Sequence, residues 1–438
     1  MSALNEFDPF EQRISAALDE VAAPRRPDYL DAVLRQTATT AQRPRWTFAG
    51  RWLPMSVGRA GTSLGGRLPV RPVLLMVLAV LVLLAALASV AIVGSRHRLP
   101  APFGLAGNGQ IAYPSNGDLY VRDALGGGGH LLVGGDGDQG YPTYSPDGTR
   151  VAFSTTIGRK EWLEVADADG SNVRRLLDVP LVNASTAWSP DSRTLAVSTD
   201  VQGLPVVYLV PADGSPARTL DLGGIHPSDA SWQPPVGDRI LFKGLGDDGV
   251  TDLYTIRPDG TDLRALGLRA TSPTFGPDYV LSGAVFSPDG RTIAYNAILL
   301  DPTTNKEYFR VGLVAPDGTL AHLPPAPTDL AVQEGWPQWS PDGDSILVHR
   351  WTWAAAGPAA AGWVAVMPAA GSGPARDIGP KIAGGEKTDI TKLWSPDGTR
   401  VILRADNTNQ VWSIDPATGF TQQLTWTTGL PDWQRVAP

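Results

Sequence analysis

The sequence predicts an all-β fold, a seven-bladed β-propeller, preceded by one transmembrane helix and a short helical N-terminal segment. Three observations predict it: a recurring aromatic-Ser-Pro-Asp-Gly motif, four strand patterns in each repeat, and one long apolar run without a charge. The repeats occupy residues 109–438, about three quarters of the chain.

The motif recurs at a nearly constant spacing. Trp339-Ser340-Pro341-Asp342-Gly343 is a complete copy, and the copies that begin at Trp232 and Trp433 are degenerate. Successive leading aromatics are 39 to 55 residues apart, and a period of roughly 40 to 50 residues is typical of arrays of small β units. The leading aromatics are Tyr144, Trp188, Trp232, Phe286, Trp339, Trp394 and Trp433.

One repeat shows the order of its elements. Residues 141–144 form a first strand pattern, 150–154 a second, 162–166 a third and 173–177 a fourth. Tight-turn residues separate the first from the second and the third from the fourth. Four antiparallel strands per repeat, arranged radially, make a propeller blade.

The Ser-Pro-Asp-Gly segments have the chemistry of tight turns. Proline fixes φ near −65°, aspartate accepts hydrogen bonds from backbone amides two residues on, and glycine supplies a positive φ. We therefore predict that the turn aspartates are structural and that each leading aromatic wedges between neighbouring blades. These aspartates are Asp147, Asp191, Asp289, Asp342 and Asp397.

The two ends of the repeat region complement each other. Residues 110–133 supply a second, third and fourth strand without a first, and residues 431–436 supply a first strand alone. Pairing the two fragments gives a 1+3 blade, closes the ring and removes exposed sheet edges. Six complete units and this shared unit predict seven blades.

The repeat resembles the TolB-type, WD-like β-propeller family. The resemblance rests on the aromatic-Ser-Pro-Asp-Gly motif, the Ile-Ala-Phe/Tyr-like second strand and the later Asp-x-x-Gly turn, and it covers 109–438. It implies a propeller that binds partners, without fixing which. Six blades are the alternative, because the TolB protein is six-bladed and the unit at Trp232 is degenerate.

The N-terminal region divides into four parts. Residues 1–42 predict a cytoplasmic helical segment, 43–71 an Arg/Pro/Gly-rich juxtamembrane linker, 72–94 a transmembrane helix and 95–108 a linker. The 23 residues of 72–94 carry no charge, and a helix of that length crosses a hydrocarbon core of about 30 Å. A cleaved signal peptide is the alternative, since Ala86-Leu87-Ala88 has the composition of a cleavage site.

Charge sets the predicted orientation and excludes one partner class. Seven arginines and no acid lie in residues 32–71, which places the N-terminus in the cytoplasm and the propeller outside the plasma membrane. Residues 99–438 carry 24 Lys+Arg and 37 Asp+Glu, a balance of −13. An acidic domain is a poor nucleic-acid binder. The chain has no cysteine, which excludes disulfides and thiolate metal sites.

The loops predict which face binds. Strand parity places the first-to-second and third-to-fourth turns on one face, the Ser-Pro-Asp-Gly face, and the second-to-third loops and blade crossovers on the other, the long-loop face. Loops 298–307 and 351–362 and crossovers 267–283, 324–335 and 379–391 are long, and insertions on one face of a repeat array often mark its binding face. The candidate residues there, with aromatics expected to be exposed, are Trp336, Trp351, Trp353, Tyr279 and Glu334.

Three functions are consistent with these features. The favoured one is a non-catalytic, monomeric, membrane-tethered module that binds a protein, peptide or glycan. A transmembrane sensor, laid out like membrane-anchored anti-sigma factors with residues 1–42 holding a cytoplasmic protein, is the second, and a propeller-face hydrolase or lyase the third. We expect no catalytic residue, cofactor or metal; two segments, 136–138 and 167–170, echo calcium loops but lack the closing glutamate.

Overall fold

The computed structural model describes residues 100–437 except 278, 302, 320–330, 355–356, 371–372, 384–389 and 406–407. The predicted segments 1–42, 43–71 and 72–94, and residues 95–99 of the linker 95–108, lie outside the described residues. Within the described residues, no helix is long and apolar enough to cross a membrane.

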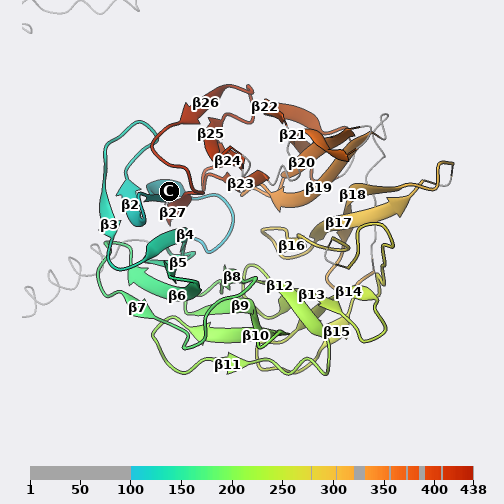
Figure 1. Cartoon of the computed structure of the whole chain (residues 1–438), viewed down its shortest axis with the longest axis horizontal. Coiled ribbons are helices and arrows are strands. Elements are labelled where there is room, and N and C mark those ends of the chain that lie inside the picture. The colour runs from blue at the N-terminus through green and yellow to red at the C-terminus, as the bar shows by residue number, and fades with distance from the viewer. Residues whose placement is uncertain are drawn as a thin grey trace, which may run out of the picture. The chain divides into compact units, whose positions relative to one another are not determined.

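The described residues form a ring of seven β-sheets without helices (Figure 1). Each sheet is a blade whose first strand lies near the centre of the ring and whose last strand lies at the rim. The prediction of seven blades is confirmed and the six-bladed alternative is wrong, because the degenerate unit at Trp232 forms a complete four-stranded sheet.

The first four blades lie in chain order around the ring, and their strands are given from the centre outwards. The ring-closing blade consists of β27 (Asp432–Val436), β1 (Gly107–Ser115), β2 (Asp118–Arg122) and β3 (Gly129–Val133). The second consists of β4 (Asp138–Tyr144), β5 (Arg150–Ile157), β6 (Lys160–Asp167) and β7 (Arg174–Arg175). The third consists of β8 (Ser185–Trp188), β9 (Thr194–Val201), β10 (Leu204–Pro211) and β11 (Arg218–Thr219). The fourth consists of β12 (His226–Trp232), β13 (Ile240–Leu245), β14 (Thr251–Ile256) and β15 (Arg264–Ala265).

The remaining three blades complete the ring. The fifth has three strands among the described residues, β16 (Val285–Phe286), β17 (Ile293–Leu300) and β18 (Glu307–Val314). The sixth consists of β19 (Val332–Trp339), β20 (Ser345–Ala354), β21 (Gly357–Pro368) and β22 (Arg376–Ala383). The seventh consists of β23 (Ile390–Trp394), β24 (Val401–Ala405), β25 (Gln410–Ile414) and β26 (Thr421–Leu424).

The predicted 1+3 closure is confirmed. Strand β27 pairs antiparallel with β1, with Ile111 opposite Trp433 and Gly107 opposite Val436. The carboxyl group of Asp432 accepts a hydrogen bond from the backbone N–H of Tyr144 at 2.7 Å. Asp432 keeps some exposed surface, but its carboxyl group is buried, which raises its pKa to about 7. This group therefore favours the folded ring less as the pH rises from about 4 through 7.

An aromatic residue lies between each pair of neighbouring blades. Seven buried apolar clusters each combine residues of two adjacent blades, and each contains one of the seven leading aromatics. Three tryptophans also donate their indole N–H to the first strand of the preceding blade: Trp188 to the carbonyl of Thr143 at 3.0 Å, Trp232 to that of Ala187 at 3.2 Å, and Trp339 to that of Val285 at 3.2 Å. The aromatics are thus the wedges that the motif predicts.

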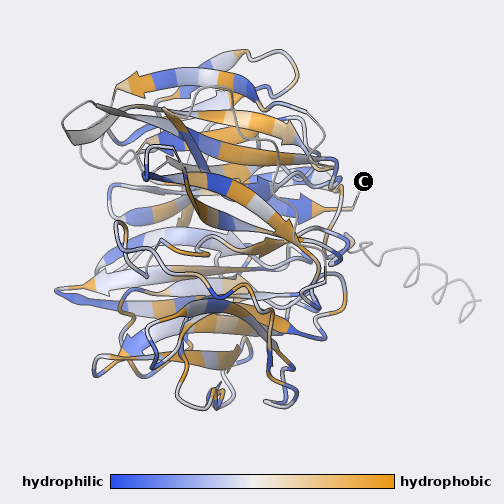
Figure 2. Ribbon diagram, turned by 90° about the vertical axis from the view of Figure 1, so that its right-hand side faces the viewer, coloured by the Kyte–Doolittle hydropathy of each residue, from blue (hydrophilic) through white to orange (hydrophobic). Residues whose placement is uncertain are grey.

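The apolar residues that make these clusters come from alternate positions of the strands. In β10, Val207 and Leu209 belong to the cluster of Trp232, whereas Tyr208 and Val210 pack in the cluster of Trp188, because successive side chains of a strand point to opposite faces. Figure 2 shows hydrophobic segments in orange interspersed with hydrophilic segments in blue along the strands. Each blade therefore uses both sheet faces against its two neighbours.

Hydrogen bonds inside the motif hold the first-to-second turns. The serine hydroxyl donates to the aspartate carboxylate at 2.5–2.6 Å in the turns of Asp147, Asp191, Asp289 and Asp397. The same carboxylate oxygen accepts the backbone N–H two residues further on. In the turn without glycine, Ser192 takes the left-handed conformation at φ 61°. The turn aspartates therefore accept the hydrogen bonds that fix these turns.

We predict that Trp433→Ala lowers the free energy of unfolding by about 3–5 kcal/mol, because it empties the cluster that closes the ring. Urea unfolding of the full chain in detergent, followed by tryptophan fluorescence, measures the change. The matched control is Phe420→Ala, whose side chain is 62% exposed and whose loss we expect to cost less than about 0.5 kcal/mol. Equal stability of the two variants would contradict the role of the closing wedge.

Candidate binding face

Both ends of the described chain lie on the Ser-Pro-Asp-Gly face. Gly107 opens β1 opposite Val436 at the end of β27, at the edge where first strands turn into second strands. The segment 100–106 then runs over this face: the N–H of Ala106 donates to the carbonyl of Pro396 at 3.0 Å, and Arg435 donates to the carbonyl of Gly104 at 2.7 Å. The chain's own N-terminal segment therefore covers part of this face.

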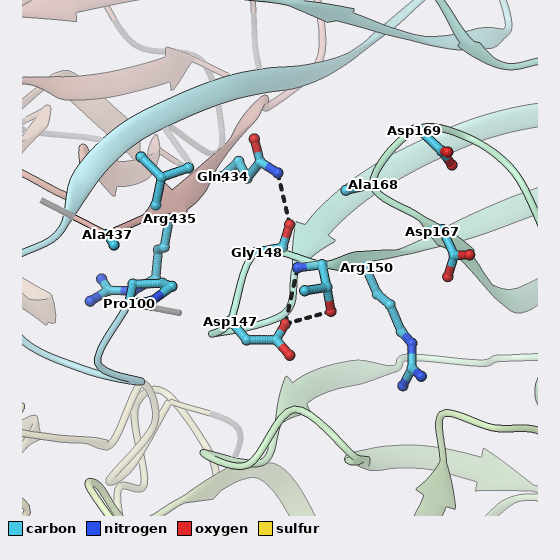
Figure 3. A pocket seen from close by; sticks show the side chains of 12 residues that line it. Pro100, Asp147, Gly148, Arg150, Asp167, Ala168, Asp169, Gln434, Arg435 and Ala437 are labelled. Atoms are coloured by element: carbon cyan, nitrogen blue, oxygen red, sulfur yellow. Dashed lines mark hydrogen bonds between the residues drawn. The ribbon is translucent and has the colours of Figure 1, made fainter. Parts of the chain in front are cut away.

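A pocket of about 970 Å³ opens on the same face, between β27, the β4–β5 turn and the β6–β7 turn (Figure 3). Its polar groups are engaged in the turns. Gln434 donates to the carbonyl of Gly148 at 2.7 Å, and Asp147 accepts from the backbone and hydroxyl of Thr149. Hydrogen bonds from Ser171 hold the pKa of Asp169 below its ordinary value. This pocket lies between two blades, and its aspartate carboxylates already hold the turns of the fold.

The opposite, long-loop face carries two extended hairpins. The prediction of long loops at 298–307 and 351–362 is wrong in part, because strand pairing extends into both ranges. Strands β17 and β18 stay paired up to Leu300 and Glu307, and β20 and β21 up to Ala354 and Gly357. The insertions therefore lengthen the strands on this face. Figure 1 shows β17–β18 projecting beyond the ring.

An aromatic cluster lies between the fifth and sixth blades at this face. Its centre is Phe309 on β18, which is 1% exposed. The ring of Trp336 on β19 stacks on Phe309 with centroids 6.1 Å apart, and Trp351 on β20 meets Phe309 edge-on at 5.2 Å. From the crossover before β16, Phe275 and Tyr279 reach the same ring at 4.7 Å and 6.3 Å. The cluster is separate from the seven inter-blade wedges.

The structure brings three of the predicted residues together, with a different exposure from the one expected. Trp336, Trp351 and Tyr279 all belong to the aromatic cluster. The expectation of an exposed Trp351 is wrong: it is 3% exposed, because Phe309 and Trp336 cover it. Tyr279 is 38% exposed and Trp336 is half-buried. The side chain of Trp353 lies outside the described residues.

Trp336 owes its position to a bulge in β19. The strand register shifts between Gly335 and Gln338, and Trp336 has φ 48°. Its backbone N–H donates to the side-chain oxygen of Asn296 on β17 at 2.5 Å. A left-handed conformation is strained for a bulky residue and persists where its surroundings hold it. The bulge thus directs Trp336 out of the regular alternation of the strand.

Charged groups line the buried side of β19. Glu334 is buried and accepts from Nε of Arg350 at 2.8 Å, and Arg350 also reaches Asp377 at 2.6 Å. Burial acts to lower the pKa of Arg350, but the two carboxylates outweigh it and raise that pKa. Glu334 therefore forms an ion pair within the protein and is not a free binding residue.

A second arginine of this region is buried more deeply. Arg310 on β18 donates to the carbonyl of Val332 at 3.1 Å and lies with its guanidinium 4.7 Å from the ring centre of Tyr308. Burial lowers the pKa of Arg310, while the nearby carboxylate of Glu334 acts against that shift. Among the described residues, Nε and Nη2 of Arg310 have no hydrogen-bond partner.

Two residues that the sequence did not point to, Phe309 and Phe275, form the centre and one wall of the cluster. Phe309 is one apolar residue in a strand of many, and nothing local distinguishes it from a wedge. Within the described residues, no three His, Asp or Glu side chains are grouped so that they could hold a metal ion.

The strand topology of the described residues defines a seven-bladed β-propeller. Residues 110–282 match the family described as TolB beta propeller domain. No curated protein matches the sequence.

Several solved structures share the fold. TolB from Acinetobacter baumannii is 18% identical over 64% of this chain, with a TM-score of 0.43, and the match spans 65% of that protein. The periplasmic gluconolactonase of Pseudomonas aeruginosa is 18% identical, with 75% of this chain and 99% of that chain covered and a TM-score of 0.51. An oligogalacturonate lyase in complex with manganese is 10% identical, with 73% and 84% covered and a TM-score of 0.51. At these identities the likeness is one of fold.

We predict that Trp351→Ala lowers the free energy of unfolding by about 3–5 kcal/mol, because it removes a buried member of the aromatic cluster. Tyr279→Ala, at the exposed rim of the same cluster, should cost less than about 1 kcal/mol. Thermal unfolding of the two variants measures the difference. A Tyr279→Ala variant as unstable as Trp351→Ala would show that the rim is part of the core.

Proposed function

We propose that the protein is a membrane-tethered, extracytoplasmic propeller that binds a protein, peptide or glycan on its long-loop face, without catalysis. Residues 72–94 act as an uncleaved anchor, with the N-terminus in the cytoplasm. The proposal combines the charge-free run of the sequence, the positive charge before it and the asymmetry of the two propeller faces.

The place at which the chain enters the propeller is the observation that supports the proposal most directly. Pro100 lies six residues beyond Gly94, and six extended residues reach roughly 20 Å. The segment that follows Pro100 is bonded to the Ser-Pro-Asp-Gly face. The chain therefore enters the propeller on the Ser-Pro-Asp-Gly face, and residues 100–106 leave the long-loop face, with its hairpins and aromatic cluster, uncovered.

Beside the aromatic cluster, binding is favoured over catalysis because the carboxylate there is held in an ion pair. Glu334, two residues before Trp336 of that cluster, is committed to Arg350. Catalytic acids and bases need a free, positioned group. The alternative of a hydrolase or lyase has support in the enzymes among the proteins of similar fold, whose names include a gluconolactonase and a lyase.

The topology has a direct test, because the chain has no cysteine of its own. We predict that Leu300→Cys, exposed at the end of β17, reacts with a membrane-impermeant maleimide in intact spheroplasts. Ala3→Cys, the matched position at the N-terminus, should react only after the membrane is permeabilised. Labelling of Ala3→Cys alone in intact spheroplasts, or of neither variant, contradicts the proposed orientation.

The binding face has a second test, based on site-specific photocrosslinking in the native membrane. We predict that benzoylphenylalanine in place of Tyr279 forms a discrete adduct of higher mass, because this ring lies at the exposed rim of the long-loop face. Phe420, an exposed aromatic in the β25–β26 turn of the opposite face, is the matched control and should form none. Adducts at Phe420 only, at both positions alike, or at neither argue against a binding role for the long-loop face.

A further inference from the structure

A second feature of the long-loop face is a pocket of about 410 Å³ between the second and third blades. Its walls are β4, β5 and β6 on one side and the crossover into β8 on the other. Its volume lies in the range of pockets that hold small ligands or single side chains with their flanking groups. The pocket is distant in the ring from the aromatic cluster, which lies between the fifth and sixth blades.

An exposed aromatic residue stands at the rim of this pocket. Tyr141 is 71% exposed although it belongs to an innermost strand. It has φ 50°, and the register of β4 shifts beside it between Gly140 and Thr143. The segment repeats the Gly-aromatic-Pro sequence and the bulge of Trp336 in β19. Trp336 is covered by Phe309, whereas the ring of Tyr141 is left to solvent.

The floor of the pocket is apolar, and its residues belong to the buried clusters between blades. Phe153 on β5 is 1% exposed, and Leu163 on β6 and Leu181 in the crossover are buried with it. An alkyl chain laid on this floor would exchange water for apolar contact. The floor therefore suits a long side chain that is apolar along its stem and polar at its end.

The polar groups around the floor are acceptors of hydrogen bonds. Glu161 is the one charged residue among the described residues that line the pocket, and no hydrogen bond or ion pair of its carboxylate occurs there. Asn183 donates its amide N–H to Asp200 at 2.8 Å, and its side-chain oxygen is an acceptor. The hydroxyl groups of Thr143, Ser154 and Thr186 also line the pocket. The pocket contains a negative charge, several acceptors and no cationic side chain.

We propose that this pocket binds an arginine side chain of a partner polypeptide. The guanidinium group stacks on the ring of Tyr141 and pairs with Glu161, and its remaining N–H groups donate to Asn183 and the threonine hydroxyls. The methylene stem lies on Phe153 and Leu163. The net charge of −13 on residues 99–438 attracts such a partner. The assignment deepens the proposed function and rests on it for the accessibility of the long-loop face to a partner.

The test measures binding to the full chain purified in detergent, by fluorescence anisotropy of a labelled Gly-Ser-Gly-Arg-Gly-Ser-Gly peptide. The same peptide with citrulline in place of arginine keeps the shape of the side chain and removes its charge. We expect citrulline to bind at least tenfold more weakly. We expect Glu161→Gln to weaken arginine binding about tenfold and Tyr141→Ala roughly three- to fivefold, whereas Tyr141→Phe keeps the affinity.

Asp344→Asn is the matched control for charge. Asp344 is exposed on the opposite face, so this substitution changes the net charge as Glu161→Gln does and should leave the affinity within twofold. If the Tyr141 and Glu161 variants unfold at the same temperature as the unaltered protein, a loss of binding does not come from a loss of folding. Equal binding of the arginine and citrulline peptides, equal losses in Glu161→Gln and Asp344→Asn, or displacement of the peptide by a neutral methyl glucoside overturns the assignment.

The experiments distinguish a failure of the pocket assignment from a failure of the proposed function. Absence of arginine binding up to millimolar concentration, together with crosslinking at Tyr279, overturns the pocket assignment and leaves the binding face in place. Arginine binding that obeys the variant pattern, together with inverted maleimide labelling, supports the pocket and overturns the topology. Raising the salt concentration should weaken binding of the arginine peptide and leave the residual binding of the citrulline peptide unchanged.

Discussion

The fold depends on one repeated contact, an aromatic side chain of the first strand inserted between two blades. Trp188, Trp232 and Trp339 each bury the ring against the preceding blade and donate their indole N–H to its first strand. The contact joins burial of a large apolar surface to a hydrogen bond that fixes register. Because each blade is held by the next, the ring is stable only when the last wedge, Trp433, closes it against β1. A Ser-Pro-Asp turn follows five of the seven wedges at once and fixes the direction of the next strand.

This arrangement makes the two faces chemically unequal. On the Ser-Pro-Asp-Gly face, serine and aspartate side chains are consumed by the turns, and segment 100–106 is bonded across them. On the long-loop face no repeated motif fixes the loops, so their length and composition differ from blade to blade. The extended β17–β18 and β20–β21 hairpins and the pocket beside Tyr141 are products of that freedom. A surface that varies where the scaffold repeats is the surface on which specificity can be built.

The sequence predicted the ring better than the site, and the reason is physical. Blade number, closure and the wedge positions follow from local chemistry that recurs every 39 to 55 residues. The aromatic cluster depends on contacts between residues far apart in sequence, such as Phe275 with Phe309, that no local pattern marks. The expected exposure of Trp351 was wrong for the same reason, since its covering residues lie on two other strands. Tyr141 was assigned only to a strand, because a bulge with a left-handed residue leaves no signature in a single copy of the sequence.

The same Gly-aromatic-Pro bulge leaves its aromatic side chain exposed at Tyr141 and covered at Trp336. Tyr141 and Trp336 share a left-handed backbone and stand three residues before their wedges. The difference lies in the preceding blade. Before Trp336, the long β17–β18 hairpin brings Phe309 over the indole and Asn296 to its backbone. Before Tyr141, the β1–β2 hairpin turns at Asn116 and Gly117, and the phenol ring stays exposed. The length of the neighbouring hairpin thus decides whether the bulge residue completes a core or faces solvent, and the exposed case is the one that provides an aromatic platform for a ligand.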